Sequence, residues 1–87
     1  MIGLIGMFDN KLLVNLYVLV LDKHFEIFVP VDEKVGNIVN LLDRSLLDMF
    51  SNDKKFSLLN VYSGNLYKNN DIIRNTDIQN GTKLILI

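Results

Sequence analysis

The pattern of hydrophobic and polar positions predicts two strands in the first third of the chain. Residues 12–21 are rich in branched and aromatic side chains, and residues 24–31 resume the same extended pattern after the polar pair Asp22 and Lys23. Two strands joined by so short a polar link are expected to form an antiparallel hairpin. Pro30 should close the second strand, because proline cannot donate a hydrogen bond to a sheet.

From residue 35 the apolar spacing changes to three and four, which is the period of a helix. The predicted buried face of this helix consists of Val35, Ile38, Val39, Leu42, Leu46, Met49 and Phe50. Asp32 and Glu33 lie just ahead of the helix, where its positive end favours acidic side chains. Gly36 and the lack of a Ser or Thr cap predict a weak start, at a cost of about 1 kcal/mol.

The rest of the chain predicts a third strand over residues 56–63, a short fourth strand at 66–67 and a last strand over 82–87. Residues 72–78 are too irregular for a strand and predict a packed turn or a single helical turn. This order predicts an α+β domain over residues 12–87, with a mixed four- to five-stranded sheet and one helix packed across one face. The first and last strands are expected to run parallel and side by side in the centre. Residues 1–11 would form an apolar extension.

Composition narrows the function. Of the 87 residues, 49% are hydrophobic, which excludes disorder and indicates apolar surface left uncovered after folding. The net charge of −1 provides no basic stripe, so nucleic-acid binding is not expected. Cysteine is absent, which excludes a disulfide framework, a thiolate nucleophile and a zinc knuckle.

The two apolar segments near the start do not predict an export signal or a membrane anchor. Residues 1–8 lack a positively charged beginning and lead into Asp9, Asn10 and Lys11, unlike a secretion signal. Residues 12–21 are too short to span a bilayer, which takes about 20 apolar residues. We therefore expect a cytoplasmic protein without direct membrane insertion.

Several short motifs, in order, resemble those of ubiquitin-like proteins with the β-grasp fold, over roughly residues 12–87. They are Val29-Pro30-Val31 running into Val35-Gly36-Asn37, then Gly64-Asn65-Leu66-Tyr67, Asn70-Asp71, and Ile78-Gln79-Asn80-Gly81-Thr82. Within that family the chain is most similar to the small ubiquitin-like proteins encoded with bacterial type VII secretion systems. The resemblance implies a non-catalytic protein-binding adaptor or regulator, as a cytosolic part of a membrane secretion complex.

The end of the sequence bears on the alternatives. Ubiquitin-like modifiers and sulfur carriers need a flexible tail ending in Gly-Gly, whereas this sequence ends Leu84-Ile85-Leu86-Ile87. A modifier or sulfur carrier is therefore disfavoured but stays an alternative, as does a structural homodimer.

No residue combination predicts catalysis, a cofactor or a metal ion. His24, the single histidine, adjoins a predicted turn and is expected to be solvated rather than to act as a base. Asp32 with Glu33, and Asp43 with Asp48, lack the alternating oxygen ligands of a calcium loop. Gly3 and Gly6 are neither preceded by a strand nor followed by the Gly-Lys-Ser/Thr of a phosphate loop.

Side-chain alternation predicts a second apolar face on the sheet. If Asn15 marks the outer side of the first strand, then Val14, Leu16, Val18 and Val20 face the helix. The outer side would then carry a contiguous protein-interaction patch made of Tyr17, Leu19, Phe28, Ile85 and Ile87. Three occupants remain open: residues 2–8 folded back over the patch, a second copy of the chain, or a protein partner.

Overall fold

The computed structural model describes residues 10–46 and 55–87. Strands β1 (Lys11–Val18) and β2 (Lys23–Pro30) form the predicted antiparallel hairpin, in which Lys11 lies opposite Pro30. Helix α2 (Val35–Leu46) follows, and then strands β3 (Leu58–Asn60) and β4 (Lys83–Leu86). Two short 3₁₀ helices, η1 (Leu19–Leu21) and η2 (Ile73–Asn75), lie in the connections.

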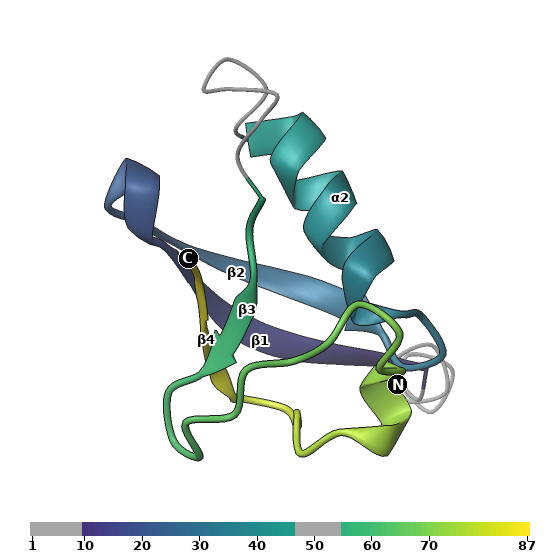
Figure 1. Cartoon of the computed structure of the whole chain (residues 1–87). Coiled ribbons are helices and arrows are strands. Elements are labelled where there is room, and N and C mark those ends of the chain that lie inside the picture. Colours follow the sequence, from purple (N-terminus) through teal and green to yellow (C-terminus); the bar gives the residue numbers. More distant parts are fainter. Residues whose placement is uncertain (1–9, 47–54) are drawn as a thin grey trace, which may run out of the picture.

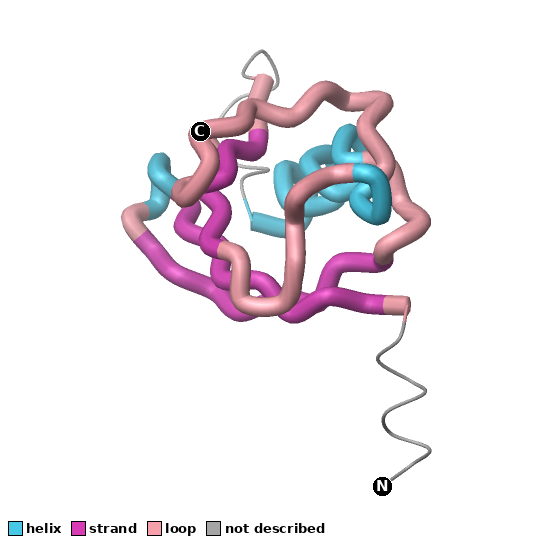
Figure 2. The backbone as a smooth tube through the Cα atoms, turned by 90° about the horizontal axis from the view of Figure 1, so that it is seen from below, coloured by secondary structure: helices cyan, strands magenta, loops and turns pink. Residues whose placement is uncertain are grey.

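The four strands form one mixed sheet in the order β2-β1-β4-β3. Strands β1 and β4 are parallel central neighbours, as predicted, with Asn15 opposite Lys83 and Leu16 opposite Leu84. Figure 1 shows α2 lying across this sheet, and Figure 2 shows the strands as a curved layer with the helix on its concave side. The predicted α+β architecture is confirmed.

The core lies between the sheet and α2. Alternate residues of the strands point toward the helix and are buried, which confirms the predicted register of the first and last strands. The core side chains from the strands are Val14, Leu16, Val18, Val29, Leu58, Leu84 and Leu86, and those from the helix are Val35, Ile38, Val39 and Leu42. In the irregular segment, η2 places Ile73 in the core and Ile78 follows it, as a packed helical turn should.

The first strand ends three residues earlier than the sequence predicts. Residues 19–21 form η1, and Asp22 closes the turn in the left-handed conformation with φ of 52°. The Tyr17 hydroxyl donates a 2.6 Å hydrogen bond to the Asp22 carboxylate, which holds the turn against the strand. Val20, predicted to face the helix, is therefore 36% exposed on η1, and Leu19 does not belong to a strand.

The third strand is also shorter than predicted, and the fourth is absent from residues 55–87. Asn60 ends β3 because its side-chain oxygen accepts hydrogen bonds from the main-chain N–H groups of Tyr62 and Ser63, which turns the chain. At the predicted fourth strand a single bridge joins Leu66 to Leu59.

The start of the helix is capped by main-chain groups that are distant in the sequence. Val35 N–H donates to the Asp71 carbonyl at 2.8 Å, and Gly36 N–H donates to the Asn69 carbonyl at 3.0 Å. The expectation of a weak, uncapped start is thus wrong, since the loop supplies the missing acceptors.

The far end of the predicted helix, including Asp48, Met49 and Phe50, lies outside the described residues, as do residues 1–9 of the predicted extension. Strand β1 begins at Lys11. Across residues 10–46 and 55–87, none of the helices combines the length and apolar character needed to cross a membrane.

Candidate protein-docking surface

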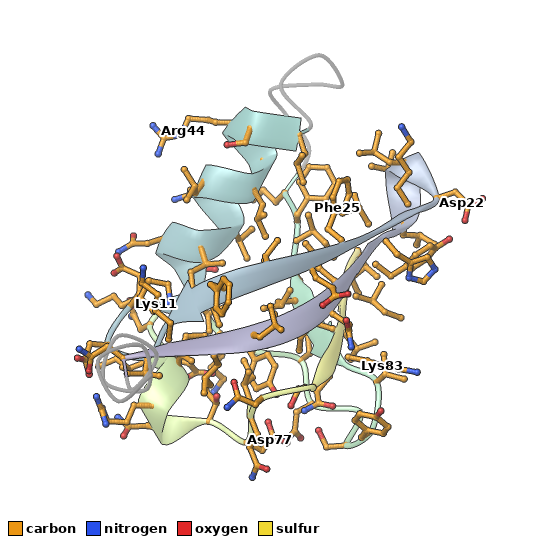
Figure 3. The ribbon with its side chains drawn as sticks, turned by 180° about the vertical axis from the view of Figure 1, so that it is seen from behind. Lys11, Asp22, Phe25, Arg44, Asp77 and Lys83 are labelled. Carbon is orange, nitrogen blue, oxygen red and sulfur yellow. The ribbon has the colours of Figure 1, made fainter. Side chains whose placement is uncertain are left out.

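The side of the sheet that faces away from α2, which we call the outer face, is the candidate site. In Figure 3 the β1–β2 hairpin runs from Lys11 to Asp22, with Arg44 of the helix on one side of it and Lys83 of β4 on the other. Strand register sorts the outward side chains beyond the Lys11–Pro30 pair into three rows that cross the sheet at right angles to the strands.

The middle row is polar. Asn15 on β1 lies opposite Glu26 on β2 and opposite Lys83 on β4. Asn15 is half-buried, whereas Glu26 and Lys83 are exposed. A carboxylate, an amide and an ammonium group therefore follow one another across three adjacent strands, and we call these three residues the polar row.

The row nearer the hairpin turn is mainly apolar. Tyr17 lies opposite His24 and Ile85, and Ile85 lies opposite Leu59. The rings of Tyr17 and His24 pack with their centroids 4.7 Å apart. The hydrogen bond to Asp22 raises the pKa of Tyr17 above its usual value, because it favours the protonated phenol. We call Tyr17, His24, Ile85 and Leu59 the aromatic row.

The third row, at the opposite end of the hairpin, pairs Leu13 with Phe28. Between this end and the turn, the outer face is hollowed into a cavity of about 540 Å³. Its lining combines the polar row with Tyr17, His24, Ile85 and Val61. An apolar floor with a few fixed polar groups is the usual composition of a recognition site.

The structure does not place the five predicted patch residues together. Tyr17 and Ile85 are direct neighbours on the outer face. Phe28 shares that face but lies on the far side of the polar row, opposite Leu13. Leu19 lies on η1, and Ile87, which is 42% exposed, follows β4 and bonds to Ser57 through its main chain. The five residues are therefore not contiguous as predicted, because Leu19 lies on η1 and the polar row separates Phe28 from Tyr17 and Ile85. Their role in protein interaction stays a prediction.

The predicted patch did not include Glu26, Lys83 or Val61. Val61 N–H donates to the Lys83 carbonyl at 3.0 Å and its side chain is 48% exposed, so it extends the middle row past β4. Glu26 lies two residues before Phe28 on the same strand, and this spacing alone places both side chains on one side of the sheet. No local signal marks the alignment of Lys83 with Asn15, because it depends on the pairing of strands from opposite ends of the chain.

A second polar cluster lies in the loop between β3 and β4. The Tyr67 hydroxyl donates to the Asp77 carboxylate and accepts a 3.0 Å bond from the buried Asn60 amide, while the Asn65 amide donates to Asp77 at 2.8 Å. Burial, with the bond to Asp77, raises the pKa of Tyr67 to about 12, and the Tyr67 hydrogen bond lowers the pKa of Asp77. These groups satisfy one another, so the cluster fastens the loop.

His24 is exposed and stacks on Tyr17, consistent with the expected solvated position. Within residues 10–46 and 55–87, no three His, Cys, Asp or Glu side chains come close enough together to hold a metal ion.

Comparison with known proteins identifies the fold through structure alone. No family model and no curated protein matches the sequence. A solved structure titled "Molecular Mimicry of SUMO promotes DNA repair" superposes with a TM-score of 0.70 at 14% identity, covering 90% of this chain and 91% of the other. A ubiquitin-like domain of an Arabidopsis thaliana protein superposes with a TM-score of 0.67 at 15% identity, covering 90% and 77%.

The fold is a ubiquitin-like β-grasp. A further similar chain comes from a structure titled "MycP5-free ESX-5 inner membrane complex, State II". It superposes with a TM-score of 0.72 at 10% identity, over 90% of this chain and 21% of that chain. At these identities the comparisons establish the architecture alone.

Proposed function

We propose that this protein is a non-catalytic ubiquitin-like adaptor or regulator that docks a protein partner on its outer face. The observation that carries the proposal is the composition of that face. Half-buried Tyr17 and Ile85 form an apolar floor beside a cavity of about 540 Å³, and the polar row supplies one positive, one negative and one amide group. An aromatic anchor surrounded by oriented polar groups is a composition that favours specific binding over nonspecific association.

The partner, in this proposal, is a cytosolic component of a bacterial type VII secretion machine. Two independent likenesses support it: the motif resemblance of residues 29–37 and 64–84, and the superposition on a domain within a chain of an ESX-5 inner membrane complex. The similar domain occupies a fifth of that longer chain. In this proposal the domain described here works beside such a complex from the cytoplasm.

Site-specific photocrosslinking in the native cell tests this function. A photoreactive amino acid at Ile85 should crosslink to a cytosolic domain of the secretion machine, identified by mass spectrometry. The control carries the same group at Asn40, which is exposed on α2 away from the outer face. Crosslinks to secretion components at Ile85 and not at Asn40 support the proposal. Crosslinks only at Asn40, or only to proteins unrelated to secretion, would refute it.

A further inference from the structure

The polar row carries two charges that have no ion-pair partner among the described residues. Within residues 10–46 and 55–87, the one ion pair joins Arg74 to Asp32. Glu26 and Lys83 are both exposed and are separated by Asn15 on the strand between them. Since neighbouring strands lie about 4.8 Å apart, the main chains at the two ends of the row are about 10 Å apart. The row thus presents opposite charges at fixed positions to whatever covers the face.

We infer that this face is self-complementary and that a second copy of the chain packs on it about a two-fold axis parallel to β1. A rotation of 180° about an axis running along β1 turns the outer face over and exchanges its left and right sides. Glu26 then lies over Lys83 of the second copy, Lys83 lies over its Glu26, and Asn15 lies over Asn15. Two ion pairs and an amide pair form from one row, as an isologous interface requires.

The same rotation keeps apolar side chains together. The axis runs along the strands, so each row lies over the same row of the second copy. Tyr17 therefore meets Tyr17, and Ile85 meets His24 across the interface. Face-to-face sheets pack about 10 Å apart with their strands within about 30° of each other, an arrangement that this axis permits.

The alternative two-fold axis, at right angles to the strands, is disfavoured by the same residues. It would place Glu26 over Glu26 and Lys83 over Lys83, and it would bring the aromatic row over the row of Leu13 and Phe28. Like charges held opposite each other oppose association. The order of charges in the polar row therefore favours the axis parallel to β1 over the axis at right angles to it.

The dimer should be weak and reversible. Strands β2, β1 and β4 overlap with β4, β1 and β2 of the second copy, which gives a contact of roughly 300 Å² per copy from strand spacing and length. Stable interfaces bury about 800 Å² per partner. Self-association of two copies should therefore require a high protein concentration. Because it uses the face proposed for the partner, self-association and partner binding would exclude each other.

Charge exchange tests the geometry directly. Sedimentation velocity and a series of ¹⁵N NMR spectra would follow self-association up to about 1 mM protein. Glu26→Lys alone would bring two ammonium groups together at each symmetry-related pair, and Lys83→Glu alone would bring two carboxylates together there. Each single variant should weaken the dimer about tenfold or more, since both pairs turn from attraction to repulsion.

Two rescue experiments follow from the two-fold axis. An equimolar mixture of Glu26→Lys and Lys83→Glu restores both pairs and should dimerise as well as the wild type. The double variant Glu26→Lys/Lys83→Glu should also recover, because its row is complementary in the reversed sense. Asp43→Lys and Arg44→Glu on α2 change the net charge equally and serve as controls, which should associate like the wild type. Circular dichroism verifies that every variant is folded.

The outcomes separate this proposal from the proposed function. A wild-type protein that stays monomeric at about 1 mM would overturn the dimer, as would folded single variants that fail to recover on mixing. Crosslinking of Ile85 to a secretion component in that case leaves the adaptor function intact. Conversely, a rescued dimer without such crosslinks keeps the self-association and removes the adaptor function.

Discussion

Replacing Gly36 by alanine is expected to destabilise the protein, although the same change in most helices stabilises it. Gly36 lies in the first turn of α2, where alanine has a better helix propensity than glycine by about 1 kcal/mol. In this fold a Cβ atom at position 36 would lie 2.9 Å from the Asn69 Cβ, 3.0 Å from its carbonyl oxygen and 3.2 Å from its Cα. Two of these three neighbours belong to the main chain and cannot move by side-chain rotation.

The loop would have to retreat to make room. That movement breaks or stretches the two hydrogen bonds that cap the helix, from Gly36 N–H to Asn69 and from Val35 N–H to Asp71. Each such bond contributes about 1 kcal/mol, and its loss leaves a donor at the helix end without a partner. With the strain of the displaced loop, these losses exceed the propensity gain by about 1–2 kcal/mol.

Thermal unfolding followed by circular dichroism measures this balance. For a domain of this size, a change of 1 kcal/mol shifts Tm by about 4–8 °C, so Gly36→Ala should lower Tm by about 10 °C. The control is Asn40→Ala, on the exposed side of the same helix, which should leave Tm unchanged or slightly raised. A Gly36→Ala protein as stable as the wild type would show that the loop does not approach α2 as closely as described.

Three further changes probe the face and the loop. Leu84→Asp should unfold the domain, because Leu84 is 1% exposed, whereas Ile85→Asp should leave the fold intact and abolish docking. Circular dichroism measures the folding of both variants, and unfolding by Ile85→Asp alone would contradict the strand register. Tyr67→Phe should cost about 1–2 kcal/mol in urea unfolding, because Asp77 and Asn60 lose their shared partner. The pKa of Asp77 is depressed in the fold, so the stability that its ionised carboxylate contributes is present above the unfolded pKa of about 3.8 and is lost as the pH falls further. The urea midpoint of the wild type should therefore drop between about pH 5 and 3, and the drop should be smaller in Tyr67→Phe.

The parts of the fold that the sequence predicted are those set by alternation and period. Val14, Leu16 and Val18 face the helix because side chains on a strand alternate, and the spacing of Val35, Ile38 and Leu42 places them on one side of a helix. The antiparallel hairpin followed from a short polar link. The apolar stripe of the helix has to be buried, and in so small a chain the sheet is the surface that can cover it. The packing of the helix across the sheet could therefore be predicted from the sequence.

The errors occurred where a side chain or a distant loop decides the local structure. Residues 19–21 have the composition of a strand, but the Asp22 turn and its bond from Tyr17 curl them into η1. The residues around Asn60 continue the apolar pattern, yet its side chain caps the turn that ends β3. The helix cap comes from residues 69 and 71, about 35 positions away, which no window along the sequence includes. Tertiary contacts overrode local propensity in each case.

The outer face was predicted as apolar because alternation fixes which side a residue faces but not which residues share a row. Pairing of β1 with β4 aligns Asn15 with Lys83, and the hairpin aligns Asn15 with Glu26. A shift of β4 by two residues would keep Leu84 and Leu86 on the side of the helix and Lys83 and Ile85 on the outer side. It would, however, move Lys83 away from Asn15 and break the polar row. The parallel register of β1 and β4 thus sets the order of charges on the outer face independently of core packing. Charge exchange at Glu26 and Lys83 therefore tests that register in solution, whereas substitutions in the core do not.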